Sequence, residues 1–134
     1  MIFNIQRDSP VPIYEQIVAQ VTFAVAAASL RPGDFIPSVR DLASDLVLNP
    51  NTVARAFVEL EKRGVVVARR GRGMAVADEA VALCRQQRLQ MVRERIRAAL
   101  QEVGFSGLTP AEIKKVVDEE LAQAPRQAQF REKH

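Results

Sequence analysis

Arginine supplies most of the positive charge of this 134-residue chain, and three arginines gather in one short stretch. Fifteen of the nineteen Lys and Arg residues are arginine, although the formal net charge is only +3. The stretch is Arg-Arg-Gly-Arg-Gly, residues 69–73. A guanidinium group donates paired hydrogen bonds that match phosphate or guanine, and glycine permits close approach of the backbone. Because neither half of the chain is strongly basic, the pattern predicts a nucleic-acid contact made by this local cluster.

Side chains that could perform catalysis or hold a metal are scarce. With one histidine, His134, and one cysteine, Cys84, the chain cannot build a His/Cys metal cluster, and a nucleophile–base pair is not expected. Asp118, Glu119 and Glu120 follow one another on a predicted helix, so they point in different directions and form no acid–base pair. We therefore expect no enzyme activity, no cofactor and no metal. Cys84 is expected to be a buried core residue, with a redox-sensing thiol as the alternative.

The composition is typical of a soluble globular protein. Apolar residues make up 48% of the chain and charged residues 26%. No apolar run approaches the ~20 residues needed to cross a bilayer, so no membrane partner is expected. The N-terminus lacks the basic start and apolar core of a signal peptide, and a single cysteine fits a reducing compartment. These features predict a cytoplasmic protein.

Three helices are predicted before the arginine stretch, and the first two follow a short β segment at residues 2–5. The first helix is indicated by apolar residues that recur every three or four positions: Ile13, Ile17, Val21, Ala24, Val25 and Ala28. Proline and glycine within residues 30–34 end it. Ser38 can cap a short second helix. The inner face of that second helix comprises Val39, Leu42, Ala43 and Leu46.

A third helix is predicted from about Asn51 to Arg63, with Gly64 in the position that ends it. On a helical wheel its buried face comprises Val53, Ala56, Phe57 and Leu60. The opposite face comprises Asn51, Arg55, Val58 and Lys62. Residues 65–68 and 74–77 then predict two short strands joined by a tight turn at the arginines.

The order of these elements predicts a winged helix-turn-helix. The second and third helices are separated by a four-residue turn, a spacing at which the later helix can enter the DNA major groove. Asn51 and Thr52 fall at the N-terminus of that helix, where polar groups can meet phosphates and base edges. The arginine-rich turn would contact phosphates or a minor groove. The alternative is that the polar face of the third helix is only a solvated surface.

One segment, PGDFIPSVRDLASDLVLNPNTVARAFVELEKRGVVVARRGRGMAV, resembles the DNA-binding domain of GntR-type bacterial transcription regulators. The signals that match in register are Pro-Ser-Val-Arg-Asp-Leu-Ala, Asn-Pro-Asn-Thr-Val, Leu-Glu-Lys-Arg-Gly and Gly-Arg-Gly. With the first helix included, the similarity covers residues 10–77. The resemblance implies DNA contacts from ten residues: Ser38, Arg40, Asn51, Thr52, Arg55, Arg69, Arg70, Gly71, Arg72 and Gly73.

Three positions depart from the family pattern. Ile36 stands where leucine is usual, which is a harmless core exchange. Ala54 occupies a position that is arginine in other branches, so a base contact made there elsewhere is missing. Ala75 replaces the usual aromatic residue of the wing, so the resemblance implies no detailed wing packing. The Asn-Pro-x-Thr-Val turn and the short second half resemble the YtrA-like branch, whose members are often linked to transporter operons.

Two more helices are predicted after the hairpin. In the first, residues 79–103, apolar side chains lie near a heptad seam: Ala82, Leu89, Val92, Ile96, Ala99 and Val103. A capping box at residues 109–112, with Pro110 in the first helical position, opens the second helix, which runs to about Ala124. Past Pro125 the tail is expected to fray. The remaining arginines of the region form a solvated face with internal ion pairs or, alternatively, a secondary phosphate contact: Arg85, Arg88, Arg93, Arg95 and Arg97.

This second region predicts a homodimer, because two helices alone bury too little apolar surface to offset chain entropy. The expected dimer contacts are Leu89, Val92, Ile96, Leu100, Val103, Ile113, Val117 and Leu121. The alternative is that the two helices fold back and complete a monomeric core. A dimer would present its recognition helices about 34 Å apart, so the operator should be an inverted repeat.

The predicted fold class is mainly α with a small β-hairpin wing. A winged helix-turn-helix domain would cover residues 1–77, and a two-helix dimerisation or effector region would cover residues 78–134. The predicted function is sequence-specific regulation of transcription on double-stranded DNA, most simply repression. The alternative is a winged-helix adaptor that holds proteins together and never reads DNA. A small-molecule effector, if there is one, would sit at the subunit interface or between the two parts, because two helices cannot enclose a cavity alone.

Overall fold

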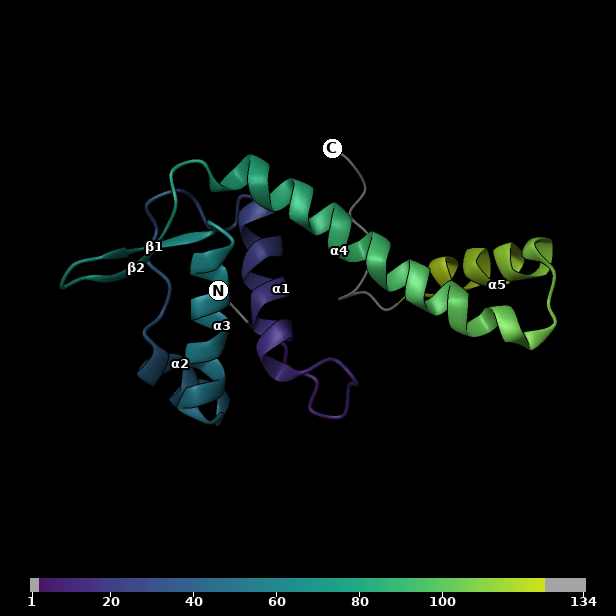
Figure 1. Cartoon of the computed structure of the whole chain (residues 1–134), viewed down its shortest axis with the longest axis horizontal. Coiled ribbons are helices and arrows are strands. Elements are labelled where there is room, and N and C mark those ends of the chain that lie inside the picture. The colour runs from purple at the N-terminus through teal and green to yellow at the C-terminus, as the bar shows by residue number, and fades with distance from the viewer. Residues whose placement is uncertain (1–2, 125–134) are drawn as a thin grey trace. The chain divides into compact units, whose positions relative to one another are not determined.

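The computed structural model describes residues 3–124, which form five α-helices and one two-stranded sheet (Figure 1). The elements are α1 (Ile13–Ala26), α2 (Val39–Leu46), α3 (Pro50–Lys62), β1 (Val66–Arg69), β2 (Gly73–Val76), α4 (Ala80–Val103), the 3-10 turn η1 (Gly104–Ser106) and α5 (Pro110–Ala122). This confirms the predicted fold class. The chain divides into two compact units, one ending at Glu94 and the other beginning at Arg95. The tail past Pro125, including His134, lies outside the described residues. Within the described range, none of the helices has the length and apolar character required of a membrane span.

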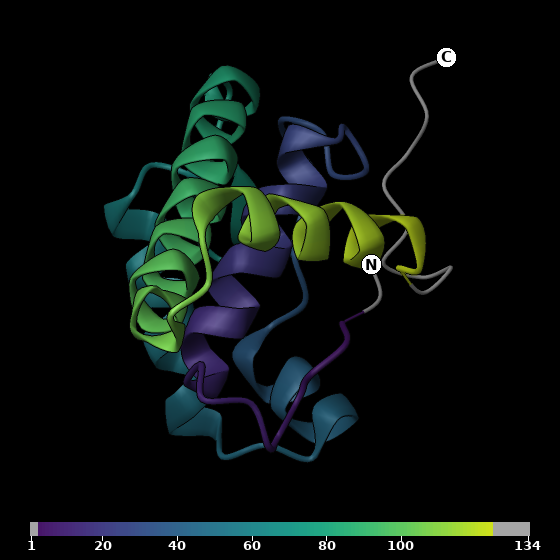
Figure 2. The ribbon, with the colours of Figure 1, turned by 90° about the vertical axis from the view of Figure 1, so that its right-hand side faces the viewer.

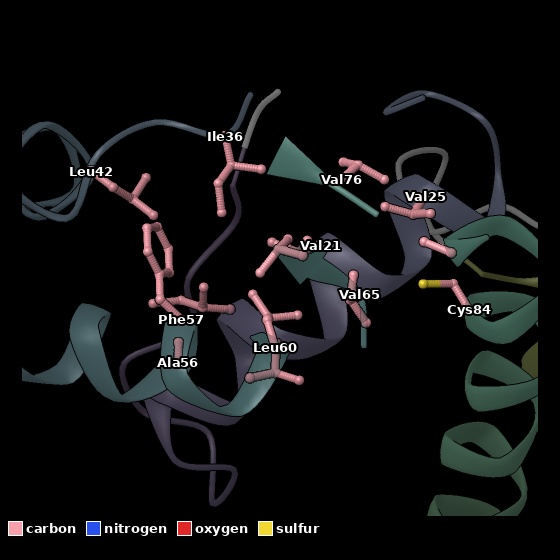
Figure 3. Close-up of a cluster of buried hydrophobic side chains, with 14 of the residues drawn as sticks. Val21, Val25, Ile36, Leu42, Ala56, Phe57, Leu60, Val65, Val76 and Cys84 are labelled. Atoms are coloured by element: carbon pink, nitrogen blue, oxygen red, sulfur yellow. The ribbon is translucent and has the colours of Figure 1, made fainter. Parts of the chain in front are cut away.

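The core of the first unit lies between α1 and α3 and is completed by the hairpin (Figure 3). Figure 3 shows Leu60 of α3 pointing toward Val21 of α1. All four residues predicted for the buried face of α3 are buried, which confirms the helical-wheel assignment. The fully buried large side chains of the unit include Ile17, Val18, Val21 and Val25 of α1, Val53 and Leu60 of α3, and Val65, Val66 and Val76 of the hairpin region.

The part of the chain before α2 differs from the sequence prediction in two places. Residues 3–5 form no strand. The side-chain amide of Gln20 in α1 instead pairs with the backbone of Asn4, accepting from its N–H at 2.8 Å and donating to its C=O at 2.7 Å. A helix side chain thus supplies the hydrogen bonds that a partner strand would otherwise provide. The predicted apolar stripe of α1 also runs too far, because the helix ends before Ala28, which is exposed and has a φ of 63°.

Local side-chain caps determine where α2 and α3 begin. The Oγ of Ser38 accepts a hydrogen bond from the backbone N–H three residues on at 3.0 Å. The Oδ1 of Asn49 accepts from the N–H two residues on at 2.8 Å. Gly64 follows α3 with a φ of 80°, a left-handed conformation that glycine adopts at little cost. The Ser38 cap and the glycine stop are therefore confirmed, and α3 begins one residue early because Pro50 occupies its first position.

Strands β1 and β2 form an antiparallel hairpin whose strands are each displaced by one residue from the predicted ranges 65–68 and 74–77. The register pairs Val66 with Val76, Val67 with Ala75, Ala68 with Met74 and Arg69 with Gly73. Phe35, from the segment before α2, adds an antiparallel bridge to Ala75. This segment therefore connects the hairpin to the start of the helix-turn-helix.

The first turns of α4 belong to the first unit. Ala80 and Cys84 are fully buried in its core, and the Nε of Arg85 donates to the C=O of Ala26 at 3.1 Å. The unit therefore extends past residue 77, the boundary chosen from the sequence. Burial raises the pKa of the Cys84 thiol to about 11. The predicted core cysteine is confirmed, and the thiolate that redox sensing requires is disfavoured.

The second unit consists of the end of α4, η1 and α5 (Figure 2). The predicted capping box is present, since the N–H of Glu112 donates to the Oγ1 of Thr109 at 3.2 Å and the N–H of Thr109 donates to the Oε1 of Glu112 at 2.9 Å. The hydrogen bond from the Thr109 backbone N–H lowers the pKa of the Glu112 carboxyl. Helix α5 ends at Ala122, slightly before the predicted end. No side chain within residues 95–124 is buried, so the described part of this unit has no core of its own.

We expect Leu60→Ala to destabilise the protein by about 2–5 kcal/mol, because it leaves a cavity where the side chain is fully buried. Urea denaturation followed by circular dichroism measures the change. The matched control is Val58→Ala on the same helix, where the side chain is 59% exposed and the change should stay within about 0.5 kcal/mol. Equal losses in the two variants would contradict the assignment of the buried face of α3.

Candidate nucleic-acid interface

A three-residue turn, residues 47–49, joins α2 to α3, one residue shorter than predicted. Val47 adopts a left-handed conformation with a φ of 54°. The Nη2 of Arg7 donates to the C=O of Leu46 at 2.8 Å and to the C=O of Val47 at 3.2 Å. Carbonyls at a helix C-terminus carry partial negative charge, which the guanidinium compensates. The N-terminal segment thereby helps to fix the direction in which α3 leaves α2.

The face of α3 opposite the core lies at the surface, as predicted. Asn51, Arg55, Val58 and Lys62 are exposed, and Thr52 is half-buried. Asn51 and Arg55 are four residues apart and so lie on neighbouring turns of the same face. Both belong to the N-terminal half of the helix, where the backbone dipole favours an anion such as phosphate.

The C-terminal half of α3 balances its charges internally. The Nε of Arg63 lies 2.7 Å from the Oε2 of Glu59, and the Nζ of Lys62 lies 3.9 Å from the Oε1 of Glu59. The hydrogen bond from Arg63 lowers the pKa of Glu59, because it stabilises the charged carboxylate. The outward positive charge of α3 is therefore concentrated at Arg55 rather than at its last turn.

Arg55 stacks on an aromatic ring of α1. Its guanidinium carbon lies 3.9 Å from the centroid of the Tyr14 ring, within the range of a cation–π contact. Tyr14 is half-buried near the start of α1 and packs against the core. The orientation of Arg55 is therefore influenced by a residue from another helix.

Two further predicted contact residues, Ser38 and Arg40, lie exposed at the start of α2. The hydroxyl oxygen of Ser38 is occupied as the helix cap, but a hydroxyl can still donate its hydrogen to a phosphate oxygen. Arg40 lines a shallow surface groove with Ala43, Ser44 and Pro50. Both residues are therefore accessible to a ligand.

The turn between β1 and β2 forms an arginine-rich wing, which extends away from the helices of its unit (Figure 1). All five residues from Arg69 to Gly73 are exposed. The N–H of Arg72 donates to the C=O of Arg69 at 2.8 Å and closes the turn. Gly71 and Gly73 have φ values of 72° and 109°, conformations in which a β-carbon would be strained.

An aromatic ring from outside the hairpin supports this wing. Phe35 forms a bridge with Ala75, and the guanidinium carbon of Arg72 lies 5.0 Å from the centroid of the Phe35 ring. Ala75 is only 1% exposed. Phe35 therefore provides an aromatic side chain beside the position where the sequence lacks the family's usual one.

Sequence reasoning did not identify Arg7, Tyr14 or Phe35. Each acts through a contact between segments that are distant in sequence, and neither periodicity nor spacing predicts which segments meet. The only available signal was that aromatic residues are rare, at 5% of the chain, and that Tyr14 stands near the edge of an apolar stripe. All ten predicted contact residues lie on the first unit, nine of them exposed. Within residues 3–124 there is no group of three or more His, Cys, Asp or Glu side chains that could hold a metal ion.

A three-helix core, a short turn before an exposed polar helix and a cationic hairpin define the DNA-binding winged helix-turn-helix of transcription regulators. The chain belongs to the GntR family: residues 13–76 match the family model described as bacterial regulatory proteins, gntR family. It is 34% identical over 105 residues to the HTH-type transcriptional repressor YtrA of Bacillus subtilis, an alignment that covers 78% of this chain and 81% of YtrA. The predicted resemblance to this family and to its YtrA-like branch is confirmed.

Two solved structures support the same assignment. A protein from Listeria monocytogenes EGD-e, described as a transcriptional antiterminator, superposes with a TM-score of 0.67 at 34% identity and covers 89% of each chain. YtrA from Sulfolobus acidocaldarius, a GntR-family transcription factor, superposes with a TM-score of 0.58 at 36% identity, over 75% of this chain and 99% of that one. Members of this family are transcription regulators rather than enzymes, and this chain is therefore a regulator.

Ser38→Ala should lower the free energy of unfolding by about 1 kcal/mol, because the first turn of α2 loses its cap. Ser38→Asp retains a capping oxygen and should keep nearly wild-type stability, yet it should weaken DNA binding because its charge repels phosphate. Thermal denaturation and fluorescence anisotropy with a labelled duplex measure the two effects separately. If the aspartate variant lost as much stability as the alanine variant, the capping role would be wrong.

Proposed function

We propose that the protein binds an inverted-repeat operator as a homodimer and represses transcription. The observation that carries the proposal is that one rigid core holds both the exposed polar face of α3 and the arginine wing. Helix α3 would enter the major groove, and the wing would contact the adjacent phosphates or minor groove. Repression is supported by the relationship to YtrA of Bacillus subtilis, which is described as a repressor.

The DNA contacts divide into positioning and base recognition. Ser38 and Thr52 carry hydroxyl groups suited to phosphate oxygens, and the wing arginines supply charge to the backbone. Arg55 and Arg40 are the candidates for base edges, since a guanidinium can donate two parallel hydrogen bonds to guanine O6 and N7. Asn51 can do the same for adenine N6 and N7.

A second copy of this chain is the partner that best fits the exposed apolar residues of α4 and α5. On α4 these residues recur every three or four positions and are 38–59% exposed: Leu89, Val92, Ile96, Leu100 and Val103. On α5, Val117 and Leu121 are also about half exposed, and Ile113 is half-buried. Apolar rows of this kind are stabilised when another helix covers them. Two-fold symmetry would then require a palindromic operator, with half-sites about 34 Å apart.

The proposed dimer also suggests where an effector would bind and where the operator should be sought. An effector, if one controls the protein, would bind at the subunit interface, where two copies could enclose a cavity. The YtrA-like character makes transporter operons the first place to search for the operator. A repressor that binds chromosomal DNA in a bacterium acts in the cytoplasm, which is where we place this protein.

Replacing Arg69, Arg70 and Arg72 together with alanine should weaken operator binding. It should also reduce the slope of log affinity against log salt by about one for each arginine that neutralises a phosphate. Fluorescence anisotropy with a duplex selected from random DNA, measured at several KCl concentrations, gives both quantities. A wing variant that keeps the wild-type slope would show that the wing neutralises no phosphate, whereas a wild-type protein with no salt-dependent affinity for DNA would favour the adaptor that never reads DNA. The matched control replaces Arg93, Arg97 and Lys115, which removes the same charge from exposed positions on α4 and α5 and should leave the slope nearly unchanged.

Introducing Ile96→Glu and Leu100→Glu together should convert the dimer to a monomer, because four buried carboxylates would face one another across the interface. Sedimentation equilibrium should then report half the wild-type mass, and affinity for the palindrome should fall toward that for a single half-site. Gln101→Glu adds a charge at an exposed position of the same helix and should remain dimeric. A wild-type protein that sediments as a monomer at micromolar concentration would refute the dimer.

A further inference from the structure

Two of the arginines on the proposed DNA-binding surface rest on aromatic rings, and the two stacks differ in geometry. Arg55 lies 3.9 Å from the Tyr14 centroid, whereas Arg72 lies 5.0 Å from the Phe35 centroid. Phe35 is 40% exposed, while Tyr14 is held at the rim of the core. The closer and better-anchored pair involves the arginine that is placed to read a base.

We propose that Tyr14 is a positioning residue for base recognition. Its ring fixes the guanidinium plane of Arg55 so that the N–H edge is presented to a guanine in the major groove. This inference rests on the proposed function, because it assigns a specificity-determining residue to the same DNA-binding surface. Tyr14 acts through Arg55 and does not need to touch DNA.

The backbones on both sides of the stack are fixed by the core. Arg55 lies between Val53 and Ala56, both of which are fully buried, so α3 is packed against the core at this point. Tyr14 lies one turn before Ile17 and Val18, which are buried in the same core. The freedom that remains is in the long arginine side chain, and the ring restricts it.

The start of α1, which carries Tyr14, is held by a second set of contacts. The side chain of Gln16 donates to the C=O of Gln6 at 2.8 Å and to the C=O of Val11 at 2.9 Å. Its Oε1 accepts from the N–H of Gln6 at 2.7 Å. The Tyr14 hydroxyl lies 3.3 Å from a carboxylate oxygen of Glu15, to which it donates. The ring is therefore attached to a well-braced helix start.

The stack leaves the recognition chemistry of Arg55 intact. A ring beneath a guanidinium occupies the face of that group, whereas its N–H donors point outward in its plane. Two parallel N–H donors in that plane match guanine O6 and N7. A lysine in the same place would supply charge without this planar pair, so the arrangement requires arginine, and guanine is the base whose edge in the major groove matches it.

The competing partner for Arg55 is already engaged. Glu59 lies one helical turn further along α3 and could draw the guanidinium along the helix axis. Its carboxylate is instead bound by Arg63 at 2.7 Å and approached by Lys62 at 3.9 Å. Arg55 contributes only a coulombic attraction to Glu59, weaker than the hydrogen bond from Arg63, so the contact that orients the Arg55 guanidinium is the tyrosine ring at 3.9 Å.

The test compares four proteins on the selected operator and on duplexes that change one base pair at a time: wild type, Tyr14→Phe, Tyr14→Leu and Arg55→Ala. Arg55→Ala should lose about 5- to 150-fold in discrimination at one G·C pair. Tyr14→Leu should lose about 2- to 10-fold at that same pair, with little change elsewhere, whereas Tyr14→Phe keeps the ring and should retain the wild-type preference. The double variant Tyr14→Leu with Arg55→Ala should behave as Arg55→Ala alone.

Several results would overturn the inference. One is a Tyr14→Leu variant that keeps full discrimination at the pair that Arg55 reads. Another is a Tyr14→Leu variant that weakens every duplex equally even when Arg55 is absent, which would mark Tyr14 as merely structural. Circular dichroism melting identifies any variant that fails to fold. If Tyr14→Leu does not fold, the comparison of Tyr14→Phe with wild type remains: equal base preference supports the role of the ring, and a lost preference contradicts it. Phe35→Leu is the matched control, since it should alter salt dependence at the wing without changing preference at that pair. A wild-type protein with no sequence preference would refute the proposed function itself, and the role of Tyr14 with it.

Discussion

The burial of one side of α3 against α1 is the constraint on which the rest of the structure depends. Val53, Ala56 and Leu60 are all fully buried, and residues of an α-helix repeat at about 100° each. Once that side is fixed, the opposite side can only face outward, and it carries Asn51 and Arg55. The proposed DNA-binding surface is therefore the side of α3 opposite the hydrophobic core.

The charge of the protein acts through placement rather than quantity. A net charge of +3 is too small to attract DNA over the whole surface, but the wing groups three arginines on one tight turn. Within α3, Glu59 binds Arg63, which leaves Arg55 as the directional donor. Tyr14 and Phe35 then place a ring beside one arginine of the helix and one of the wing. The proposed DNA recognition therefore needs only a few oriented guanidinium groups.

Local features were predictable from the sequence, and long-range contacts were not. The Ser38 cap, the Gly64 stop and the capping box at Thr109 depend on residues within one turn, so their spacing was sufficient to identify them. The strand predicted at residues 2–5 failed in its described part because the side chain of Gln20 satisfies that backbone instead. The domain boundary fell too early for a similar reason, since burial of the start of α4 depends on tertiary packing. The contacts of Tyr14 and Phe35 with arginines could not be predicted, because periodicity does not say which distant segments meet.

The most direct test is an NMR titration of isotopically labelled protein with the inverted-repeat duplex selected from random DNA. If α3 and the wing bind DNA, the largest changes in amide chemical shift should occur at the N-terminal half of α3 and at residues 69–73, and the amides of α5 should change little. Shifts confined to residues 95–124, or no shifts at low salt, would contradict the claim that α3 and the wing form the DNA-binding surface.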